Sequence, residues 1–381
     1  MKVAFYLTDT KCMHDGVTRY LHKIVEIYEN QGIDAEFMGA ALLSRKESVE
    51  QTAADLKEVV PNMPVRLKKT KLPGRVLSRT QYLLPMNYDK LFGEKAELYV
   101  FPINFMPRNK PKKAKGVVVM HDVSPLLSEK YPWLLKKVYK HMYGRTVKNA
   151  DLIFTDSENS KKEIVGLFPK ADGKIVVNYC GTDAETFAAP VTEEKAKEVR
   201  EKYGAGEGYY LFVGRDRENK NLPRLLEAYA ALPKEIREKR KIVIANHLQP
   251  LKEFADSLHT EGIVLLDGVD EEDLTALVQG AAALCLVSVS EGFGLPLIEG
   301  MAAGVPTIAS NVSCLPEVAG GASLLVDPYD VQSIANALQR VVSDEALRVE
   351  LIEKGKQRAA VFTWESSART FKEEIKKILC K

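Results

Sequence analysis

Short aliphatic and β-branched runs alternate with helical stretches from one end of the chain to the other, and this alternation restricts the possible folds most strongly. The runs are apolar along their whole length, which is typical of parallel strands that helices cover on both faces. The predicted strands are residues 3–7, 98–101, 117–120, 152–155 and 175–178, then 209–213, 241–245, 262–266, 283–287 and 305–309. The clearest helices between them are residues 222–232, 274–282 and 333–342. Repeated strand–helix units of this kind predict a doubly wound α/β sheet.

The alternation occurs twice, so we expect two Rossmann-like domains. A polar, proline-containing stretch around residues 184–192 separates the two sets of strands. A length of 381 residues also suits two domains of ordinary size. We place the first domain at residues 1–187 and the second at 188–362. Residues 363–381 form a predicted helix that either caps the second domain or crosses back to the first.

Composition excludes several classes of protein. A hydrophobic content of 45% and a charged content of 28% are typical of soluble globular proteins. No stretch has the roughly 18 uncharged apolar residues that a membrane-spanning helix needs, and the N-terminal run MKVAFYLTDT is a predicted strand instead of a signal peptide. We therefore expect a cytoplasmic protein. The five cysteines are scattered and form no C-x-x-C pair, so neither disulfides nor zinc are predicted, and Cys285 is expected to be buried.

Charge is distributed unevenly along the chain. Residues 1–190 hold 30 Lys and Arg against 22 Asp and Glu, whereas residues 191–381 hold 24 against 30. The basic excess is concentrated in residues 66–75 and 109–115. A basic surface attracts phosphates, acidic lipid or nucleic acid, and solvated loops can have the same composition without any partner. The residues alone do not separate these two interpretations.

Residues 288–310 carry the strongest signal for a binding site. A predicted buried strand ends at Val287, a glycine-rich turn with Gly292 and Gly294 follows, and a helix begins near Leu295. Ligands of open α/β sheets bind beyond the carboxyl ends of the strands, and a helix N-terminus there favours an anion. The two acidic residues of this segment, Glu291 and Glu299, are eight residues apart. That spacing is about 2.2 helical turns, so both carboxylates could face one cleft.

Basic residues follow a second predicted strand. In the run V-G-R-D-R-E-N-K-N, which begins at residue 213, Arg215 and Lys220 lie where the strand turns into a helix. Arginine offers a planar fork of donors and lysine a mobile point charge, and together they suit a diphosphate. Arg217 competes with Arg215 for the arginine role.

These segments resemble one known family. The run E-G-F-G-L-P-L-I-E, residues 291–299, resembles the E-x7-E signature of the retaining glycosyltransferases of the GT-B class, called family 4 or group 1. The segments that follow, G-M-A-A-G-V-P-T-I-A-S and L-P-E-V-A-G, and the earlier G-R-x4-K-N run are similar to that family too. The resemblance covers essentially the whole chain and is strongest over residues 209–342. It implies a GT-B fold, in which two Rossmann-like domains face each other across a cleft.

The resemblance also implies roles for these residues. Arg215 and Lys220 would bind the donor diphosphate and stabilise it as its negative charge grows on departure. Glu291 would hold the hydroxyls of the donor sugar, and Glu299 those of the ribose. The rest of the donor-binding run consists of Gly292, Phe293, Gly294 and Leu295.

Two residues of the first half complete the implied site. Gly16 follows the first predicted strand and would let the backbone pass close to the diphosphate, although Asp15 stands where the family usually has another glycine. His121 ends the strand at 117–120 and would contact the donor sugar. Asp122 either orients His121 or begins the next segment. The implied catalytic set is thus Glu291, His121, Arg215 and Lys220.

The implied reaction moves a hexose from a nucleotide diphosphate sugar to a glycan or lipid-linked acceptor of a surface polysaccharide, with retention at the anomeric carbon. GDP-mannose is the favoured donor, and a UDP-hexose is the alternative. No zinc spacing, P-loop or D-x-D pair is present, so neither a metal nor another cofactor is expected. Nucleic acid is not an expected partner. A lipid-linked acceptor at the inner face of the cytoplasmic membrane would explain the basic first half through peripheral contact with anionic lipid.

Three other functions are compatible with such a chain. A sugar-nucleotide epimerase could have the same two domains but needs no acceptor. A glycan phosphorylase needs phosphate and a lysine-bound cofactor, for which the chain is short. A non-catalytic glycan-binding subunit has no need of Arg215, Lys220, Glu291 and Glu299 together.

Overall fold

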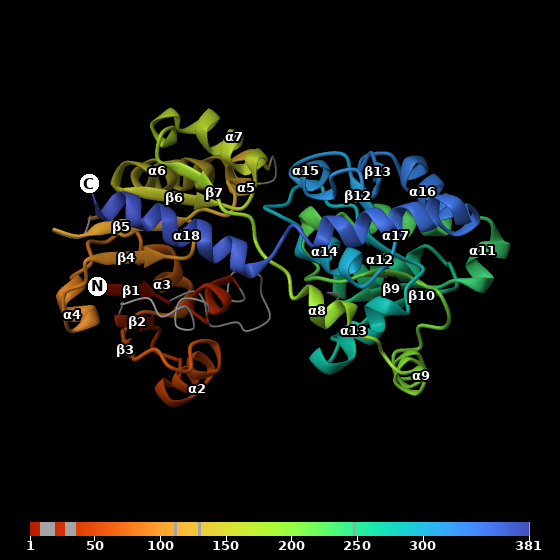
Figure 1. Ribbon diagram of the computed structural model, residues 1–381, viewed down its shortest axis with the longest axis horizontal. Helices are drawn as coiled ribbons and strands as arrows, with labels where there is room; N and C mark the ends of the chain where they lie inside the picture. Colours follow the sequence, from red (N-terminus) through yellow and green to blue (C-terminus); the bar gives the residue numbers. More distant parts are fainter. Residues whose placement is uncertain (8–19, 27–35, 110–112, 129–130, 247–248, 381) are drawn as a thin grey trace. The chain divides into compact units, whose positions relative to one another are not determined.

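The computed structural model describes residues 1–7, 20–26, 36–109, 113–128, 131–246 and 249–380. The chain divides into two compact units, which we describe separately (Figure 1). The first unit is Met1–Gly181 together with Trp364–Lys381, and the second is Thr182–Thr363. Each unit contains one parallel sheet with helices packed against it. The prediction of two Rossmann-like α/β domains is therefore confirmed.

The sheet of the first unit has seven strands within the described residues, in the order β3-β2-β1-β4-β5-β6-β7. Every pair of neighbouring strands is parallel. The central strands are buried on both faces because helices cover the sheet. The strands are β1 (Lys2–Tyr6), β2 (Glu36–Leu43), β3 (Val65–Lys69), β4 (Leu98–Phe101), β5 (Lys115–Val119), β6 (Leu152–Thr155) and β7 (Ile175–Val177).

The helices of the first unit come from the segments between these strands and from the end of the chain. Those whose bounds lie within the described residues are α2 (Val49–Val59), α3 (Gly74–Thr80), α4 (Tyr88–Phe92), α5 (Ser124–Leu127), α6 (Trp133–Asn149), α7 (Glu158–Leu167), the short η1 (Pro169–Ala171) and α18 (Trp364–Leu379). Residues 20–26 are helical as well. Helix α18, blue in Figure 1, lies along the sheet. Its Phe371 ring stacks on Phe154 of β6 with centroids 4.7 Å apart. The last predicted helix is thus part of the first unit, and the chain leaves this unit after Gly181 instead of residue 187.

The sheet of the second unit has six strands within the described residues, in the order β10-β9-β8-β11-β12-β13. The strands are β8 (Tyr210–Phe212), β9 (Ile242–Ala245), β10 (Ile263–Leu266), β11 (Ala283–Leu286), β12 (Thr307–Ser310) and β13 (Leu324–Val326). The central strands β8 and β11 are fully buried, which accounts for their apolar sequences.

The second unit has eleven helical segments among its described residues. They are α8 (Ala184–Ala188), α9 (Glu193–Lys202), η2 (Glu218–Lys220), α10 (Leu222–Ala230), α11 (Lys234–Lys239), α12 (Gln249–Ser257), α13 (Glu271–Gln279), α14 (Leu295–Ala302), α15 (Leu315–Ala319), α16 (Val331–Ser343) and α17 (Glu345–Ala359).

All ten predicted strands exist, and three further strands were not predicted. Strand β3 lies in the basic stretch 66–75 and alternates half-buried with exposed side chains, because it is the edge strand of its sheet. Charged residues on an edge strand oppose pairing with other chains. Strand β2 contains three residues with little β-propensity, Gly39, Ala40 and Ala41, and β13 has only three residues.

Candidate functional site

The order of strands in the second sheet reverses between β8 and β11. The chain moves outward from β8 to β9 and β10, and then returns to place β11 on the other side of β8. Leu284 of β11 pairs with Leu211 of β8. Loops that leave the carboxyl ends of two such strands diverge and leave a crevice, where ligands of open α/β sheets bind. The Arg215–Lys220 segment follows β8, and the Glu291 segment follows β11.

The structure brings Lys220 and Glu291 together across this point. The Lys220 Nζ atom lies 2.5 Å from Glu291 Oε1, although the two residues are 71 positions apart in sequence. Ser288, the second residue after β11, donates a hydrogen bond from its Oγ to the same oxygen at 2.6 Å. The side chains of Lys220 and Glu291 are only 16% and 10% exposed. A pair this well buried must keep both members, because losing one leaves an uncompensated charge.

Both side chains keep unused hydrogen-bonding capacity. The two bonds to Glu291 end on Oε1, so Oε2 has no hydrogen-bond partner among the described residues. Lysine has three N–H donors, and the bond to Glu291 is the one that Lys220 Nζ makes within the described part of the chain. The pair can therefore accept a hydroxyl group at Glu291 and donate to an anion at Lys220 without separating.

Two side chains that precede α15 hold the Glu291 loop in place through hydrogen bonds. Ser313 Oγ accepts from the Glu291 backbone N–H at 3.1 Å and donates to the Glu291 carbonyl at 3.0 Å. The Cys314 thiol donates to the carbonyls of Glu291 and Phe293 at 3.2 and 3.3 Å. These bonds fix the backbone of the loop, so the position of the Glu291 carboxylate depends little on loop flexibility.

Two asparagines join the loop after β8 to the loop after β11. The Asn219 side-chain amide donates to the Ser290 carbonyl at 2.7 Å, and the Asn219 backbone carbonyl accepts from the Val289 N–H at 2.8 Å. Asn221, which has a left-handed backbone with φ of 61°, donates to the carbonyls of Val287 and Pro328 at 3.0 and 2.7 Å. The Lys220 and Glu291 segments are thus held in a fixed relation before any ligand arrives.

The remaining predicted residues of this unit have distinct surroundings. Arg215 and Arg217 are both exposed on the loop after β8, so exposure does not choose between them. Phe293 is 4% exposed, and its ring packs edge-to-face on Phe362 at 5.2 Å. Glu299 lies within α14 and is 5% exposed, which is unusual for a carboxylate.

Gly294 is the N-cap of α14 and has a φ of +97°. A Cβ atom there would lie 2.8 Å from Leu315 Cδ2 and 3.2 Å from Leu286 Cδ2. Both the backbone conformation and the space therefore require glycine. The half-buried Gly292 and Leu295 flank this turn, and α14 begins at Leu295 with its N-terminus at the carboxyl end of β11.

His121 belongs to the first unit and follows β5. Its Nδ1 lies 2.7 Å from Asp156 Oδ2, and its Nε2 lies 3.0 Å from the Pro102 carbonyl. Because both ring nitrogens face acceptors, both must carry protons, and the ring is an imidazolium. Burial lowers the pKa of His121, but the Asp156 carboxylate and the Pro102 carbonyl outweigh burial and raise that pKa to about 9. Its side chain is 14% exposed.

Asp122 begins the next segment and does not orient His121. Its Oδ1 accepts from the Ser124 N–H at 3.1 Å, at the start of α5, and its carbonyl accepts from Tyr143 Oη at 3.1 Å. Burial raises the pKa of Asp122, although the hydrogen bond from the Ser124 N–H stabilises the carboxylate and opposes this shift. Asp156, at the end of β6, is the carboxylate that fixes the ring.

Several other expectations bear on the site. Gly16 and Asp15 lie outside the described residues. Among the described residues, no group of three or more His, Cys, Asp or Glu side chains is arranged to hold a metal ion. No helix in the described part of the chain combines the length and the apolar character that crossing a membrane requires. Cys285 is fully buried as predicted, and burial raises its pKa to about 12.

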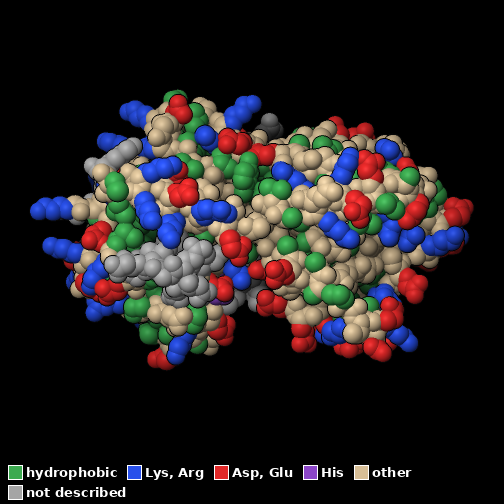
Figure 2. Space-filling view, viewed as in Figure 1, with side chains coloured by type: hydrophobic (Ala, Val, Ile, Leu, Met, Phe, Trp, Pro, Cys, Tyr) green, Lys and Arg blue, Asp and Glu red, His purple; other side chains and the backbone are tan. Residues whose placement is uncertain are grey.

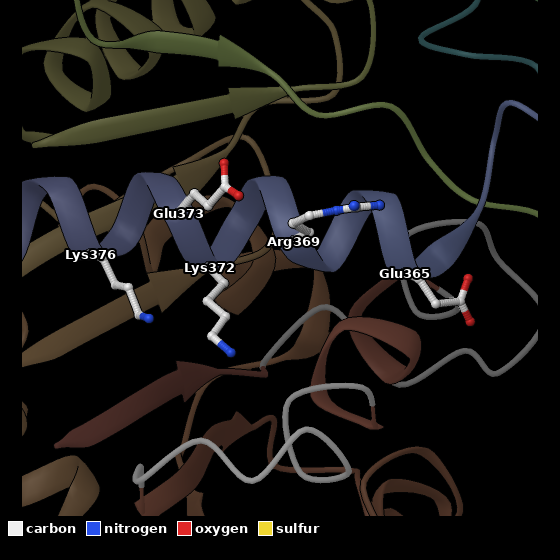
Figure 3. A pocket seen from close by; sticks show the side chains of 5 residues that line it. All are labelled: Glu365, Arg369, Lys372, Glu373 and Lys376. Atoms are coloured by element: carbon white, nitrogen blue, oxygen red, sulfur yellow. The ribbon is translucent and has the colours of Figure 1, made fainter.

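A surface pocket of about 470 Å³ runs along α18 and is distant in sequence from the predicted site residues. Figure 3 shows that side chains of this one helix line it: Glu365, Arg369, Lys372, Glu373 and Lys376. None of the predicted site residues takes part, and the pocket is lined by three basic and two acidic side chains. We assign no ligand to it.

Five residues that support the site were not predicted: Ser288, Ser313, Asn219, Asn221 and Asp156. Ser288 and Asp156 each follow a buried strand, so the strand-end rule that selected His121 applies equally to them. Nothing in the sequence marks Ser313, because it comes from a segment 22 residues after Glu291.

Comparison with known proteins gives one family match. The family model described as "Glycosyl transferases group 1" matches residues 194–358, within the second unit. The O-antigen chain mannosyltransferase B of Escherichia coli is 31% identical to the chain over 276 residues, which are 71% of this chain and 71% of that protein. The serotype-specific mannosyltransferase WbdA of Escherichia coli is 29% identical over 70% of this chain. The match covers 34% of WbdA, so the chain spans about a third of that protein's length.

Solved structures agree in fold along the whole chain. Sucrose-phosphate synthase from Thermosynechococcus elongatus superposes with a TM-score of 0.76 at 18% identity and covers 100% of this chain and 99% of its own. Anabaena Alr3699/HepE in complex with UDP-glucose gives a TM-score of 0.74 at 15% identity, with 99% and 100% covered. At such identities the likeness concerns the fold alone.

Proposed function

The chain belongs to the group 1 family of glycosyl transferases, and from this premise we propose that it transfers mannose from GDP-mannose to a bacterial surface polysaccharide. That the chain is a glycosyltransferase follows from its family. The sugar and the polysaccharide are proposed because two similar proteins are named as mannosyltransferases, one of them of the O-antigen chain. A UDP-hexose is the alternative donor, since the similar HepE structure holds UDP-glucose.

The Lys220–Glu291 pair is the observation that carries the proposal. It lies where the strand order reverses, its two loops are fixed by Ser313, Asn219 and Asn221, and each member keeps hydrogen-bonding groups for a ligand. A nucleotide diphosphate sugar presents anionic oxygens next to sugar hydroxyls. The adjacent cation and carboxylate match these two kinds of group.

We propose the following roles in the reaction. Lys220, together with Arg215, neutralises the diphosphate as the bond to the sugar breaks and negative charge grows on the leaving oxygen. Glu291 Oε2 accepts from a hydroxyl of the donor sugar while Oε1 stays with Lys220 and Ser288. Glu299 accepts from the ribose hydroxyls, and the N-terminus of α14 faces the phosphates.

Retention of the anomeric configuration is part of the proposal. Two successive inversions would need a nucleophilic side chain beneath the sugar ring. The family resemblance instead favours attack from the face that the diphosphate leaves, where the acceptor hydroxyl passes its proton to the departing phosphate oxygen. The imidazolium of His121, held by Asp156, would present a fixed positive charge from the first unit.

A donor panel tests the proposal without knowledge of the acceptor. Purified protein is heated with GDP-mannose, UDP-glucose or a dTDP-sugar, and slow donor hydrolysis is followed in parallel. A ligand at 100 times its Kd stabilises the folded state by about 2.7 kcal/mol, so the correct donor is expected to raise Tm and the others not. GDP-mannose should be hydrolysed, and NMR should show the α-anomer of mannose as the first product.

Two variants test which arginine contacts the donor. Arg215→Ala should lower the hydrolysis rate by tenfold or more, whereas Arg217→Ala, the matched control two residues away, should change it less than twofold. If only UDP-glucose raises Tm and is hydrolysed, the donor is a UDP-hexose and the assignment of the site is unchanged. Release of an epimerised sugar nucleotide would indicate an epimerase, and a chain that neither binds nor hydrolyses any nucleotide sugar would refute the proposal.

A further inference from the structure

Large hydrophobic side chains are exposed at the start of α6 and in the residues just before it. Five such residues occur between positions 127 and 138, with exposed fractions from 38% to 67%: Leu127, Tyr131, Trp133, Leu134 and Val138. Single exposed hydrophobic residues are ordinary, but a contiguous group marks an interaction surface. Trp133 and Leu134, at 67% and 61%, are the most exposed hydrophobic residues of the described chain together with Tyr329.

The other half of the same helix is fixed in the core. Met142, Tyr143, Thr146 and Val147 are buried, and Tyr139 stacks on Phe105 with ring centroids 6.2 Å apart. Residues 131–141, at the start of the helix, are mostly exposed, and the stacking of Tyr139 on Phe105 ties them to the buried part of the unit. We call these residues the α6 tip.

The α6 tip is strongly basic. Helix α6 contains five basic residues and no acidic one: Lys136, Lys137, Lys140, Arg145 and Lys148. Residues 101–150 as a whole contain eleven Lys and Arg against two acidic residues. No ion pair engages Lys136, Lys137 or Lys140 within the described part of the chain, and Lys137 Nζ lies 4.4 Å from the centre of the Trp133 ring. Figure 2, by contrast, shows acidic and basic side chains intermixed over the second unit.

The start of α6 also lacks the features that stabilise a helix N-terminus in water. Pro132 provides no side-chain cap, and no acidic residue occurs in the first turn. Lysines near a helix N-terminus oppose the helix dipole. Helix α9 has the usual arrangement, with a Thr192 cap that accepts from the Lys195 N–H and with Glu193 and Glu194 in the first turn. Helix α3 begins in the same way, so the uncapped start supports a binding role for α6 only together with its exposed hydrophobic and basic residues.

We propose that the α6 tip docks on an anionic lipid surface. Trp133 and Leu134 would enter the headgroup region, where tryptophan is favoured, and the lysines would reach lipid phosphates while their alkyl chains stay in contact with apolar groups. A second copy of the chain fits the surface poorly, because a twofold contact would set the lysines of two tips against each other. This surface lies outside the basic stretches 66–75 and 109–115 that the sequence singled out.

The inference deepens the proposed function, since a polysaccharide acceptor carried on lipid is reached from the membrane surface. Vesicle binding, however, needs neither donor nor acceptor. A chain that binds GDP-mannose but no vesicles would refute the inference and leave the proposed function intact. A chain that binds vesicles but no nucleotide sugar would refute the proposed function and leave the membrane inference intact.

The test is flotation of the full chain with phosphatidylcholine vesicles that contain 0 or roughly 30% phosphatidylglycerol. Wild type should float with the anionic vesicles only and dissociate as salt rises. Lys137→Glu combined with Lys140→Glu should lower partitioning by about 25-fold or more, since each lysine contributes roughly fivefold. Trp133→Ser combined with Leu134→Ser should lower it at least tenfold.

Matched variants make the result specific. Val349→Ser with Val361→Ser changes two exposed residues of the second unit, at 52% and 59%, and should leave partitioning unchanged. Lys68→Glu with Lys69→Glu tests the basic edge strand β3 and should have less than a threefold effect. Emission from Trp133 should shift to shorter wavelength on binding, while Trp364, which is 4% exposed, contributes a constant signal. Equal flotation of the α6 and control variants, or a dimer that Trp133→Ser dissociates, would overturn the proposal.

Discussion

At the scale of single residues, the polar pairs Lys220–Glu291 and His121–Asp156 join side chains that are distant in sequence. Lys220, Glu291 and His121 were selected because they follow strands, and the structure shows all three in buried or half-buried polar contacts. Their partners are distant in sequence: Glu291 lies 71 residues from Lys220, and Asp156 lies 35 from His121. Such pairs depend on which strands are neighbours in the sheet, and no local pattern encodes that order.

The Lys220–Glu291 pair leads to a prediction on stability. Lys220→Met or Glu291→Gln alone leaves a buried charge without its partner and should cost about 3 kcal/mol of unfolding free energy. The double variant should cost about 2 kcal/mol less than the sum of the two, because it leaves no isolated charge. Urea denaturation of the four proteins measures this coupling.

The exposed Lys234–Glu238 pair on α11 is the control for that cycle. Its side chains are 76% and 61% exposed, with Nζ and Oε1 3.5 Å apart. Its coupling should stay below about 0.5 kcal/mol. Equal coupling in the two cycles would mean that the Lys220–Glu291 contact is an ordinary surface pair.

His121 leads to a prediction on pH. Its pKa is raised to about 9 from 6.5, so the folded state binds the proton more tightly than the unfolded state does. The resulting stabilisation, on the order of 3 kcal/mol, is complete below pH 6.5 and is lost as pH rises through about 9. The difference in unfolding free energy between wild type and His121→Gln should therefore shrink by that amount from pH 6 to pH 10. A difference that is constant, or that grows with pH, would exclude the imidazolium.

At the scale of helices and strands, buried elements were predictable and edge elements were not. Strands β4 and β6 begin and end at the predicted residues because they are apolar along their whole length. Strand β3, with the sequence VRLKK, reads as part of a basic loop, since an edge strand exposes one side of its backbone and half of its side chains. The exposed end of α6 was also missed, because its apolar residues follow a helical pattern that normally indicates burial.

Gly294 leads to a prediction at this scale. Gly294→Ala should destabilise the protein by about 1 kcal/mol through the left-handed backbone alone and by more through contact with Leu315 and Leu286. Gly321→Ala is the matched control, because Gly321 has a φ of +84° but no atom within 4 Å of the added Cβ. Thermal denaturation should show a larger loss at Gly294 by at least about 1 kcal/mol. Equal losses would mean that the start of α14 adjusts freely.

At the scale of the whole molecule, the two Rossmann-like domains and the family followed from the sequence. The strand–helix alternation and the 291–299 and 214–221 motifs were sufficient for both. The return of α18 to the first unit was one of two alternatives, because the choice depends on the contact between Phe371 and Phe154 instead of on the helix's own pattern. The donor sugar is a property of shape and hydrogen bonding within the site, which the motifs leave open.

The most direct test of the central claim is a calorimetric titration of wild type and Glu291→Gln with GDP-mannose and with GDP. If Glu291 holds the donor sugar, the variant should lose about 10- to 100-fold in affinity for GDP-mannose, the value of a hydrogen bond to a charged group. Its affinity for GDP, which has no sugar hydroxyl at that position, should fall much less. An unchanged ratio of the two Kd values would contradict the assignment of the sugar to the Lys220–Glu291 pair.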